Sequence, residues 1–147
     1  MVKPWLRLAP FAAIGLVAAG VLWADAVSHS IWDGVYSAAQ AQRGATLYAN
    51  LCTSCHQDNL AGDGGDTPAL AGKAFMNDWD GQAVAALIDR IHTSMPQSDP
   101  GTLNMQQATD LTAYLLSANQ IPAGSSELSA DPQAQQNIQF QAKKPSH

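Results

Sequence analysis

Residues 52–56 are Cys-Thr-Ser-Cys-His, and they include both cysteines of the 147-residue chain. Two cysteines three positions apart on a helical turn face the same side of that turn. The thiols of Cys52 and Cys55 can therefore each add to one vinyl group of a single porphyrin. The imidazole of His56 then lies below the ring, where it can bind iron as the proximal ligand. A Cys-x-x-Cys-His motif is the attachment signal for c-type haem.

Three other uses of a cysteine pair account for this motif less well. A thioredoxin-like redox pair needs a βαβ context, whereas the flanking segments here have helical patterns. A zinc site needs four ligands, and His29, His92 and His147 lack the spacing of zinc-finger histidines. A structural disulfide would close a very short loop and would gain little loop-closure entropy. None of the three explains a histidine directly after the second cysteine.

A methionine that precedes proline, Met95, lies downstream of the motif. Proline restricts the residue before it to extended backbone, which lets the thioether of Met95 reach out of the chain. We therefore predict Met95 as the sixth ligand of the iron. Of the other methionines, Met1 lies in the export segment described below, and Met76 and Met105 lie within or beside segments that we expect to pack.

Three helices are predicted around these residues. A capping box at 37–40 opens the first helix, which runs through Gly44 and Tyr48 to the haem motif. Asp80 is the predicted N-cap of the second helix, whose apolar stripe is Val84, Leu87, Ile88 and Ile91. This helix ends at His92, which we expect to be a surface residue or a C-terminal residue that interacts with the helix dipole. A second capping signal at 104–107 opens a helix to Ser117.

The glycine-rich and aspartate-rich segment 59–72 is predicted to be a loop. A loop of this kind can wrap one edge of a haem. Phe75, Met76 and Trp79 follow it and bring apolar bulk.

The two ends of the chain differ from this central region. Residues 1–26 have the positive start, apolar run and small-x-small site of a secretory signal. A cleaved signal is favoured over an uncleaved membrane anchor formed by residues 8–24. Residues 27–36 form an arm that either packs Ile31, Trp32 or Tyr36 onto the domain or serves as a solvated linker. The domain itself spans 37–121, and 122–147 is a polar C-terminal tail, mobile or loosely docked from residue 131.

The chain resembles the class I cytochrome c family over about residues 37–121. The resemblance rests on Gly44 and Tyr48 before the haem motif, then Pro68-Ala69-Leu70, Met95-Pro96 and a helix that carries Tyr114. It implies an all-α, small cytochrome c fold in which three main helices pack around one covalently bound haem c, with irregular N- and C-terminal arms.

The resemblance also implies specific contacts. Gly44 should meet the C-terminal helix near Leu111 or Tyr114. The carbonyl of Pro68 should accept a hydrogen bond from Nδ1 of His56 and fix the orientation of the imidazole ring. The haem pocket should be lined by Leu70, Phe75 and Trp79. Of these, Trp79 is placed to reach a propionate.

The predicted function is a periplasmic one-electron carrier with His/Met-ligated haem. Residues 31–36, 100–101 and 121–124 are similar to bacterial cytochromes that accompany periplasmic quinoprotein dehydrogenases, so a haem-bearing subunit of such a complex is the alternative. Expected partners are a dehydrogenase donor and an oxidase or another cytochrome as acceptor. A haem peroxidase or gas sensor fits less well, because Met95 would have to be displaced and His92 would be the nearby acid–base residue. A formal net charge of -5 argues against nucleic acid as a partner.

Overall fold

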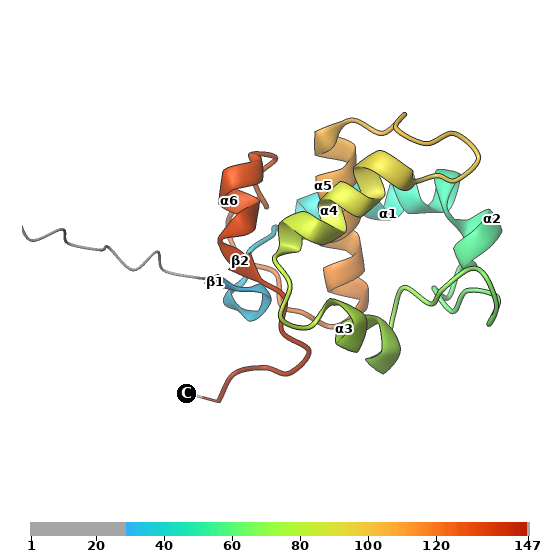
Figure 1. Cartoon of the computed structure of the whole chain (residues 1–147). Coiled ribbons are helices and arrows are strands. Elements are labelled where there is room, and N and C mark those ends of the chain that lie inside the picture. The colour runs from blue at the N-terminus through green and yellow to red at the C-terminus, as the bar shows by residue number, and fades with distance from the viewer. Residues whose placement is uncertain (1–28, 147) are drawn as a thin grey trace, which may run out of the picture.

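A computed structural model describes residues 29–146, and it consists of helices joined by loops (Figure 1). The helices are α1 (Ala38–Leu51), α2 (Thr53–His56), α3 (Lys73–Trp79), α4 (Val84–Ser94), α5 (Met105–Ala118) and α6 (Pro132–Gln136). A 3-10 turn, η1 (Ile31–Asp33), follows the short strand β1 (His29–Ser30), which pairs in parallel with β2 (Ile138–Gln139). The predicted all-α class is confirmed, with this one small pairing added.

The predicted signal at 1–26 and the anchor at 8–24 lie outside the described residues. Between residues 29 and 146, none of the helices has the length and apolar character needed to cross a membrane.

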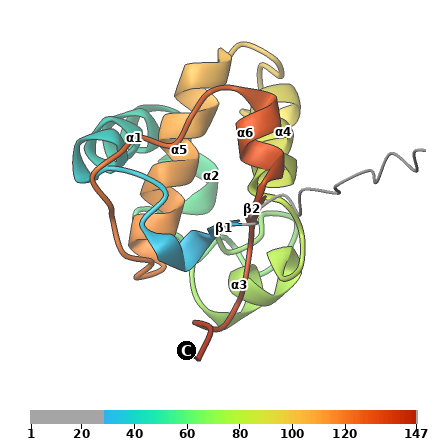
Figure 2. The same cartoon turned by 90° about the vertical axis from the view of Figure 1, so that its left-hand side faces the viewer.

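The central contact of the fold is the crossing of α1 and α5 (Figure 2). Gly44 of α1 is buried, and a Cβ atom built on it would collide with the backbone carbonyl of Asp110 and lie 2.8 Å from Cβ of Tyr114. The rings of Tyr48 and Tyr114 pack beside this point with centroids 5.1 Å apart. The predicted approach of Gly44 to the C-terminal helix is therefore confirmed, and the approach offsets the roughly 1 kcal/mol that glycine costs inside a helix.

The two predicted capping boxes have different outcomes. The box that opens α5 is complete, because Asn104 and Gln107 each accept the backbone N–H of the other at 2.9 Å. In α1 only half of the box forms: the Ser37 hydroxyl accepts from the backbone of Gln40 at 3.1 Å. The amide of Gln40 instead bonds the backbone N–H and C=O of Leu128 at 2.7 and 3.0 Å. A buried amide between helix and C-terminal segment takes the place of the second half of the box.

The predicted start of the second helix is wrong. Asp80 is not the N-cap of α4 but the C-cap of α3, a helix that the sequence did not reveal. Residues 81 and 82 pair with the C-terminal segment instead, since Gly81 N–H donates to the Phe140 carbonyl at 2.9 Å and Phe140 N–H donates to the Gln82 carbonyl at 2.7 Å. The carboxylate of Asp80 accepts the backbone N–H of Ala142 at 2.8 Å. The apolar stripe of α4 is buried as predicted.

The segment from residue 122 onward is not a polar tail that lies loosely on the domain. It forms α6 and β2, and Leu128, Ile138 and Phe140 are buried in the hydrophobic core. Phe140 is fully buried and packs edge-on against Phe75 with ring centroids 6.0 Å apart. Only a few apolar residues of this segment pack into the hydrophobic core, and the others are polar. The composition of the segment therefore resembles that of a disordered chain, although the segment is folded.

The N-terminal arm packs on the domain, which was the first of the two expectations for it. Ile31 and Tyr36 are buried, and the Tyr36 hydroxyl donates to the Ile121 carbonyl at 2.5 Å. The indole N–H of Trp32 donates to the Gln141 carbonyl at 2.9 Å. The arm and the C-terminal segment therefore hold each other in place, and neither is a solvated linker.

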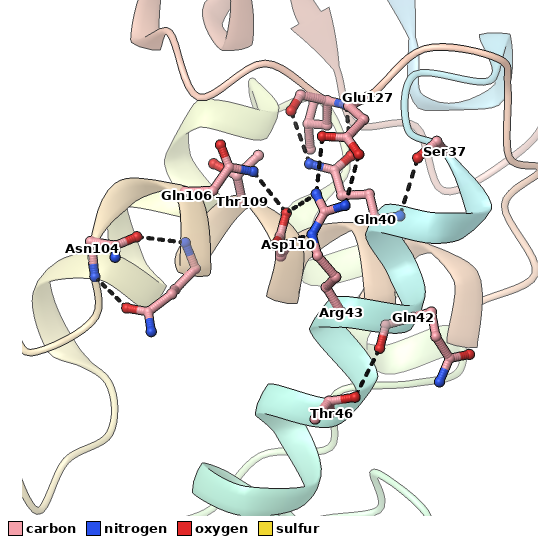
Figure 3. A network of polar contacts seen from close by, with 12 residues as sticks. Ser37, Gln40, Gln42, Arg43, Thr46, Asn104, Gln106, Thr109, Asp110 and Glu127 are labelled. Atoms are coloured by element: carbon pink, nitrogen blue, oxygen red, sulfur yellow. Dashed lines mark hydrogen bonds and ion pairs between the residues drawn. The ribbon is translucent and has the colours of Figure 1, made fainter.

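An ion-pair network ties α1, α5 and the C-terminal segment together (Figure 3). Arg43 binds both carboxylate oxygens of Asp110, at 2.9 and 3.0 Å, and both of Glu127, at 2.8 and 3.0 Å. Asp110 also accepts from Gln106 at 2.8 Å. Burial by itself would raise the pKa of Asp110, but the hydrogen bonds from Arg43 and Gln106 outweigh it and hold the pKa below its usual value. Asp110 is thus a buried carboxylate with its partners in place.

We predict that Gly44→Leu destabilises the haem-loaded protein. The added side chain meets the backbone of α5, which cannot move aside as a flexible side chain would, so overpacking should lower the free energy of unfolding by about 1–3 kcal/mol. Denaturant unfolding followed by far-ultraviolet circular dichroism measures this change. Gly65→Ala is the control, because a Cβ there has only one neighbour, at 3.6 Å. Equal midpoints for both variants would show that the crossing does not depend on Gly44.

A second prediction concerns the C-terminal segment. Phe140→Ala removes a fully buried ring from the contact with Phe75, and a change of this kind costs about 3–5 kcal/mol. Thermal unfolding should show a clear fall in the midpoint, whereas Lys144→Ala, at an exposed position, should leave it unchanged. A midpoint in Phe140→Ala that equals the wild-type value would contradict the packing of this segment.

Candidate haem site

A cavity of about 450 Å³ opens between α1, α2, α3, α4, α5 and the loop after α2. Its size lies in the range of pockets that hold large organic ligands. Every predicted site residue contributes to its wall: Cys52, Cys55, His56, Pro68, Leu70, Phe75, Trp79 and Met95. The chain folds so that residues from four separate stretches of sequence meet around one space.

The haem motif has the helical geometry that its spacing predicts. Cys52 is the C-cap of α1, and its carbonyl accepts the backbone N–H of Cys55 at 3.2 Å and of His56 at 2.9 Å. Cys52 is partly buried, Cys55 is exposed, and both are free thiols. Burial, with a smaller contribution from Cys55, raises the pKa of the Cys52 thiol to about 11. Both cysteines line the cavity and neither is in a disulfide, so both sulfurs are available where thioether bonds to a porphyrin would form.

His56 is held in one orientation by the loop that faces it. Its side chain is buried, and its Nδ1 lies 3.0 Å from the carbonyl oxygen of Pro68. A proton on Nδ1 donated to this carbonyl leaves the lone pair on Nε2 for a metal. The hydrogen bond that the resemblance implies is present.

The loop around Pro68 is itself fixed by local hydrogen bonds. The carboxylate of Asp63 accepts the backbone N–H groups of Gly65 at 2.8 Å and Thr67 at 3.0 Å, and these bonds lower the pKa of Asp63. Gly62 has φ +64°, and a Cβ there would collide with the carbonyl of Thr67 and approach Pro68 at 2.8 Å. A short, pinned loop thus presents the Pro68 carbonyl to His56.

Met95 ends α4 in the extended conformation expected before proline, with φ -120° and ψ 150°. It lies on the cavity wall, whereas Met76 and Met105 do not. Met76 is buried in the hydrophobic core and Met105 packs against that core. Among the methionines that the structure describes, Met95 is therefore the one available to a haem in this cavity.

His92 is the basic residue in the last turn of α4, as one of the two expectations for it placed it. Its Nδ1 lies 2.7 Å from the carbonyl oxygen of Leu103, so it ties the end of α4 to the segment before α5. It does not contribute to the cavity wall.

Apolar side chains that the sequence assigned only to the core also form the cavity wall. Leu87 and Ile91 come from the apolar stripe of α4, and Leu111 and Leu115 come from α5. Helical periodicity identifies such residues as buried but cannot say whether they face another helix or a ligand. Tyr48 and Arg90 also line the cavity and were not predicted to do so.

The donors present fit a covalently attached haem. Two thiols and an imidazole with a fixed tautomer lie at one part of the wall, and a thioether lies on a different element. The remaining wall is dominated by apolar side chains, as a porphyrin ring requires. A small helical domain with this cavity and this motif defines the class I c-type cytochromes.

The family comparison agrees with this class. Residues 39–115, just over half of the chain, match the family model described as "Cytochrome C oxidase, cbb3-type, subunit III". The chain belongs to this family of cytochrome c domains. It is a class I c-type cytochrome that carries covalently bound haem c and transfers electrons, and these predictions are confirmed.

Among solved structures, a chain of the sulfane dehydrogenase SoxCD from Paracoccus pantotrophus is similar, with 25% identity and a TM-score of 0.44. The match covers 66% of this chain and 52% of that chain, so this chain spans about half the length of its structural relative. A search of curated proteins found no match.

We predict that haem is attached through two thioether bonds. The mass of the protein denatured in acidic organic solvent should equal polypeptide plus one haem. Cys52→Ala should retain at most one thioether, while Ser54→Ala, which changes an exposed residue between the cysteines, should retain both. Haem that extracts freely from the wild-type protein would contradict attachment at these residues.

Proposed function

We propose that the protein is a periplasmic one-electron carrier whose haem iron is ligated by His56 and Met95. The observation that supports this most strongly is that both side chains reach the wall of one cavity from separate elements, His56 from α2 and Met95 from the end of α4. When bound, haem c supplies a one-electron couple, and ligation by histidine and methionine raises its reduction potential.

The chain's own contribution is to orient the ligands and exclude water. Pro68 fixes the imidazole of His56, and Pro96 fixes the backbone of Met95. Leu87, Ile91 and other apolar side chains surround the ring position and lower the local dielectric constant. If His56 and Met95 both bound the iron, no position on it would remain for a substrate, and the protein would act as a carrier and not as an enzyme in its own right.

The contact of His92 adds to the case against a haem peroxidase. A peroxidase reaction needs an acid–base residue beside an open iron position. His92, the histidine nearest to Met95 in sequence, is bonded to the Leu103 carbonyl and does not line the cavity.

The proposed partners are redox proteins of the same compartment: a dehydrogenase as donor, and an oxidase or another cytochrome as acceptor. The chain carries a formal net charge of -5, so association with a basic partner surface should be steered by electrostatics. Electron transfer between carriers uses small, short-lived interfaces.

The alternative is a permanent haem-bearing subunit of a periplasmic dehydrogenase complex. Purification from periplasm and membrane fractions, followed by gel filtration, separates a monomeric carrier from such a subunit.

We predict that Met95→Ala opens the iron to external ligands. The wild-type protein should be low-spin, should show the weak ferric absorption band that reports sulfur–iron bonding, and should not bind carbon monoxide at neutral pH. The variant should bind carbon monoxide or cyanide, become partly high-spin and have a lower reduction potential, because a thioether favours ferrous iron.

The matched control is Met105→Leu, which changes a methionine packed against the core but away from the cavity wall. Its spectra should equal those of the wild type. A wild-type protein that already binds carbon monoxide and lacks the sulfur–iron band would overturn ligation by Met95 and, with it, the proposal of a simple carrier.

A further inference from the structure

The residue that follows His56 has an unusual backbone conformation. Gln57 is the C-cap of α2, with φ 63° and ψ 162°. This region of φ and ψ is essentially limited to glycine, and other residues keep it only where the surrounding structure holds them there. The side chain of Gln57 is exposed, so side-chain packing does not account for the strain. The contacts that hold Gln57 are therefore made to its backbone.

Three hydrogen bonds hold the backbone of Gln57. Its N–H donates to the Thr53 carbonyl at 2.9 Å, and its carbonyl accepts the N–H of Leu60 at 3.2 Å. The same carbonyl accepts the hydroxyl of Tyr48 at 2.7 Å. The first two bonds are local to the turn, whereas Tyr48 belongs to α1 and is buried. The Tyr48 hydroxyl therefore ties this turn to the helix that precedes the haem motif.

The strained turn begins the loop that returns to His56. The N–H of Gly62 donates to the His56 carbonyl at 3.2 Å. Further along, the N–H of Leu70 donates to the Leu60 carbonyl at 2.8 Å. Pro68 lies between these two points, and its carbonyl oxygen is 3.0 Å from Nδ1 of His56. The direction in which the chain leaves α2 therefore decides where this carbonyl lies.

We propose that Tyr48 is a positioning residue for the haem ligand His56. Its hydroxyl holds Gln57 in the strained conformation, and the turn fixed in this way sets the hydrogen bond between His56 and Pro68. This inference rests on the part of the proposed function in which His56 binds the iron. The ring of Tyr48 has a separate role, since it packs against Tyr114 at the helix crossing. The positioning role belongs to the hydroxyl alone.

The effect of the hydroxyl reaches the iron through the imidazole. A hydrogen bond from Nδ1–H of His56 to a carbonyl makes the imidazole a stronger donor to the metal. A stronger donor stabilises ferric iron and lowers the reduction potential. Without the Tyr48 hydroxyl, Gln57 can relax to an ordinary conformation, which moves the loop and weakens this hydrogen bond. The reduction potential should then rise.

The experiment compares haem-loaded wild type with four variants: Tyr48→Phe, the control Tyr36→Phe, Gln57→Gly, and Tyr48→Phe combined with Gln57→Gly. Tyr36 is a matched control, because its hydroxyl also donates to a backbone carbonyl, that of Ile121, but it does not line the cavity. Each phenylalanine substitution removes one oxygen atom and one hydrogen bond to the backbone. Exchange of the His56 Nδ1 proton with deuterium, followed by NMR of the reduced protein, reports the bond to Pro68. Redox titration gives the midpoint potential.

Tyr48→Phe should speed exchange of the Nδ1 proton by about two- to tenfold, the range that weakening or loss of one hydrogen bond gives. It should also raise the midpoint potential, whereas Tyr36→Phe should leave both values at those of the wild type. Glycine adopts the conformation of Gln57 without strain, so in the Gln57→Gly background nothing drives the loop to move. Removal of the Tyr48 hydroxyl should therefore change exchange and potential much less in that background.

Unchanged exchange and potential in Tyr48→Phe, or equal changes in Tyr48→Phe and Tyr36→Phe, would overturn the proposal and leave Tyr48 a packing residue. Equal effects of the hydroxyl with glutamine and with glycine at position 57 would also overturn it, because the hydroxyl would then hold no strain. If Tyr48→Phe attaches no haem, the double variant decides: haem restored by Gln57→Gly supports the proposal, and haem absent from both variants rejects it.

Failure of the proposed function gives a different result. A wild-type protein in which the haem ring current does not shift the ring protons of His56 would reject His56 as the ligand, whatever the variants show.

Discussion

The close crossing of α1 and α5 is the contact on which the other features depend. Because Gly44 has no side chain, the helices approach until its Cα faces the backbone of Asp110. The approach fixes the C-terminal end of α1, and the haem motif follows there without a break, since Cys52 caps that helix. It also fixes the face of α5 that presents Leu111 and Leu115 to the cavity. The position of the thiols relative to the opposite wall thus follows from a helix contact outside the site.

The cavity shows why cofactor and fold belong together. Its volume of about 450 Å³ lies inside the same group of helices that forms the hydrophobic core. An unfilled apolar cavity costs about 24 cal/mol per Å³, so the upper limit for this one is about 11 kcal/mol. Small domains have net stabilities of about 5–15 kcal/mol. Even part of this upper limit is a large share of that stability, so we expect the ring to act as part of the core and the protein without haem to be largely unfolded.

Local signals in the sequence predicted the site better than they predicted the ends of the domain. The spacing of Cys52, Cys55 and His56 follows from chemistry on one helical turn, and a proline after Met95 acts on its neighbour alone, so neither needs knowledge of the fold. The role of Asp80 depends on a segment 62 residues later in the chain, because the backbone N–H of Ala142 donates to its carboxylate. The amide of Gln40 is likewise used by Leu128. Long-range backbone pairing of this kind leaves no periodic pattern in a polar segment, and the C-terminal segment was missed for that reason.

The arrangement of the two ends of the molecule bears on how the carrier meets its partners. Leu51 is the large apolar side chain that remains exposed in the described region, and it lines the cavity beside Cys52. An exposed apolar side chain therefore lies next to the cysteine that begins the haem motif. In Figure 1, β1, where the described chain begins, lies at the other end of the molecule from α2. Because β1 is clamped by β2 and by the bond from Trp32 to Gln141, this separation is fixed. Attachment of the domain through its N-terminal side would therefore leave the end of the molecule that carries the haem motif free.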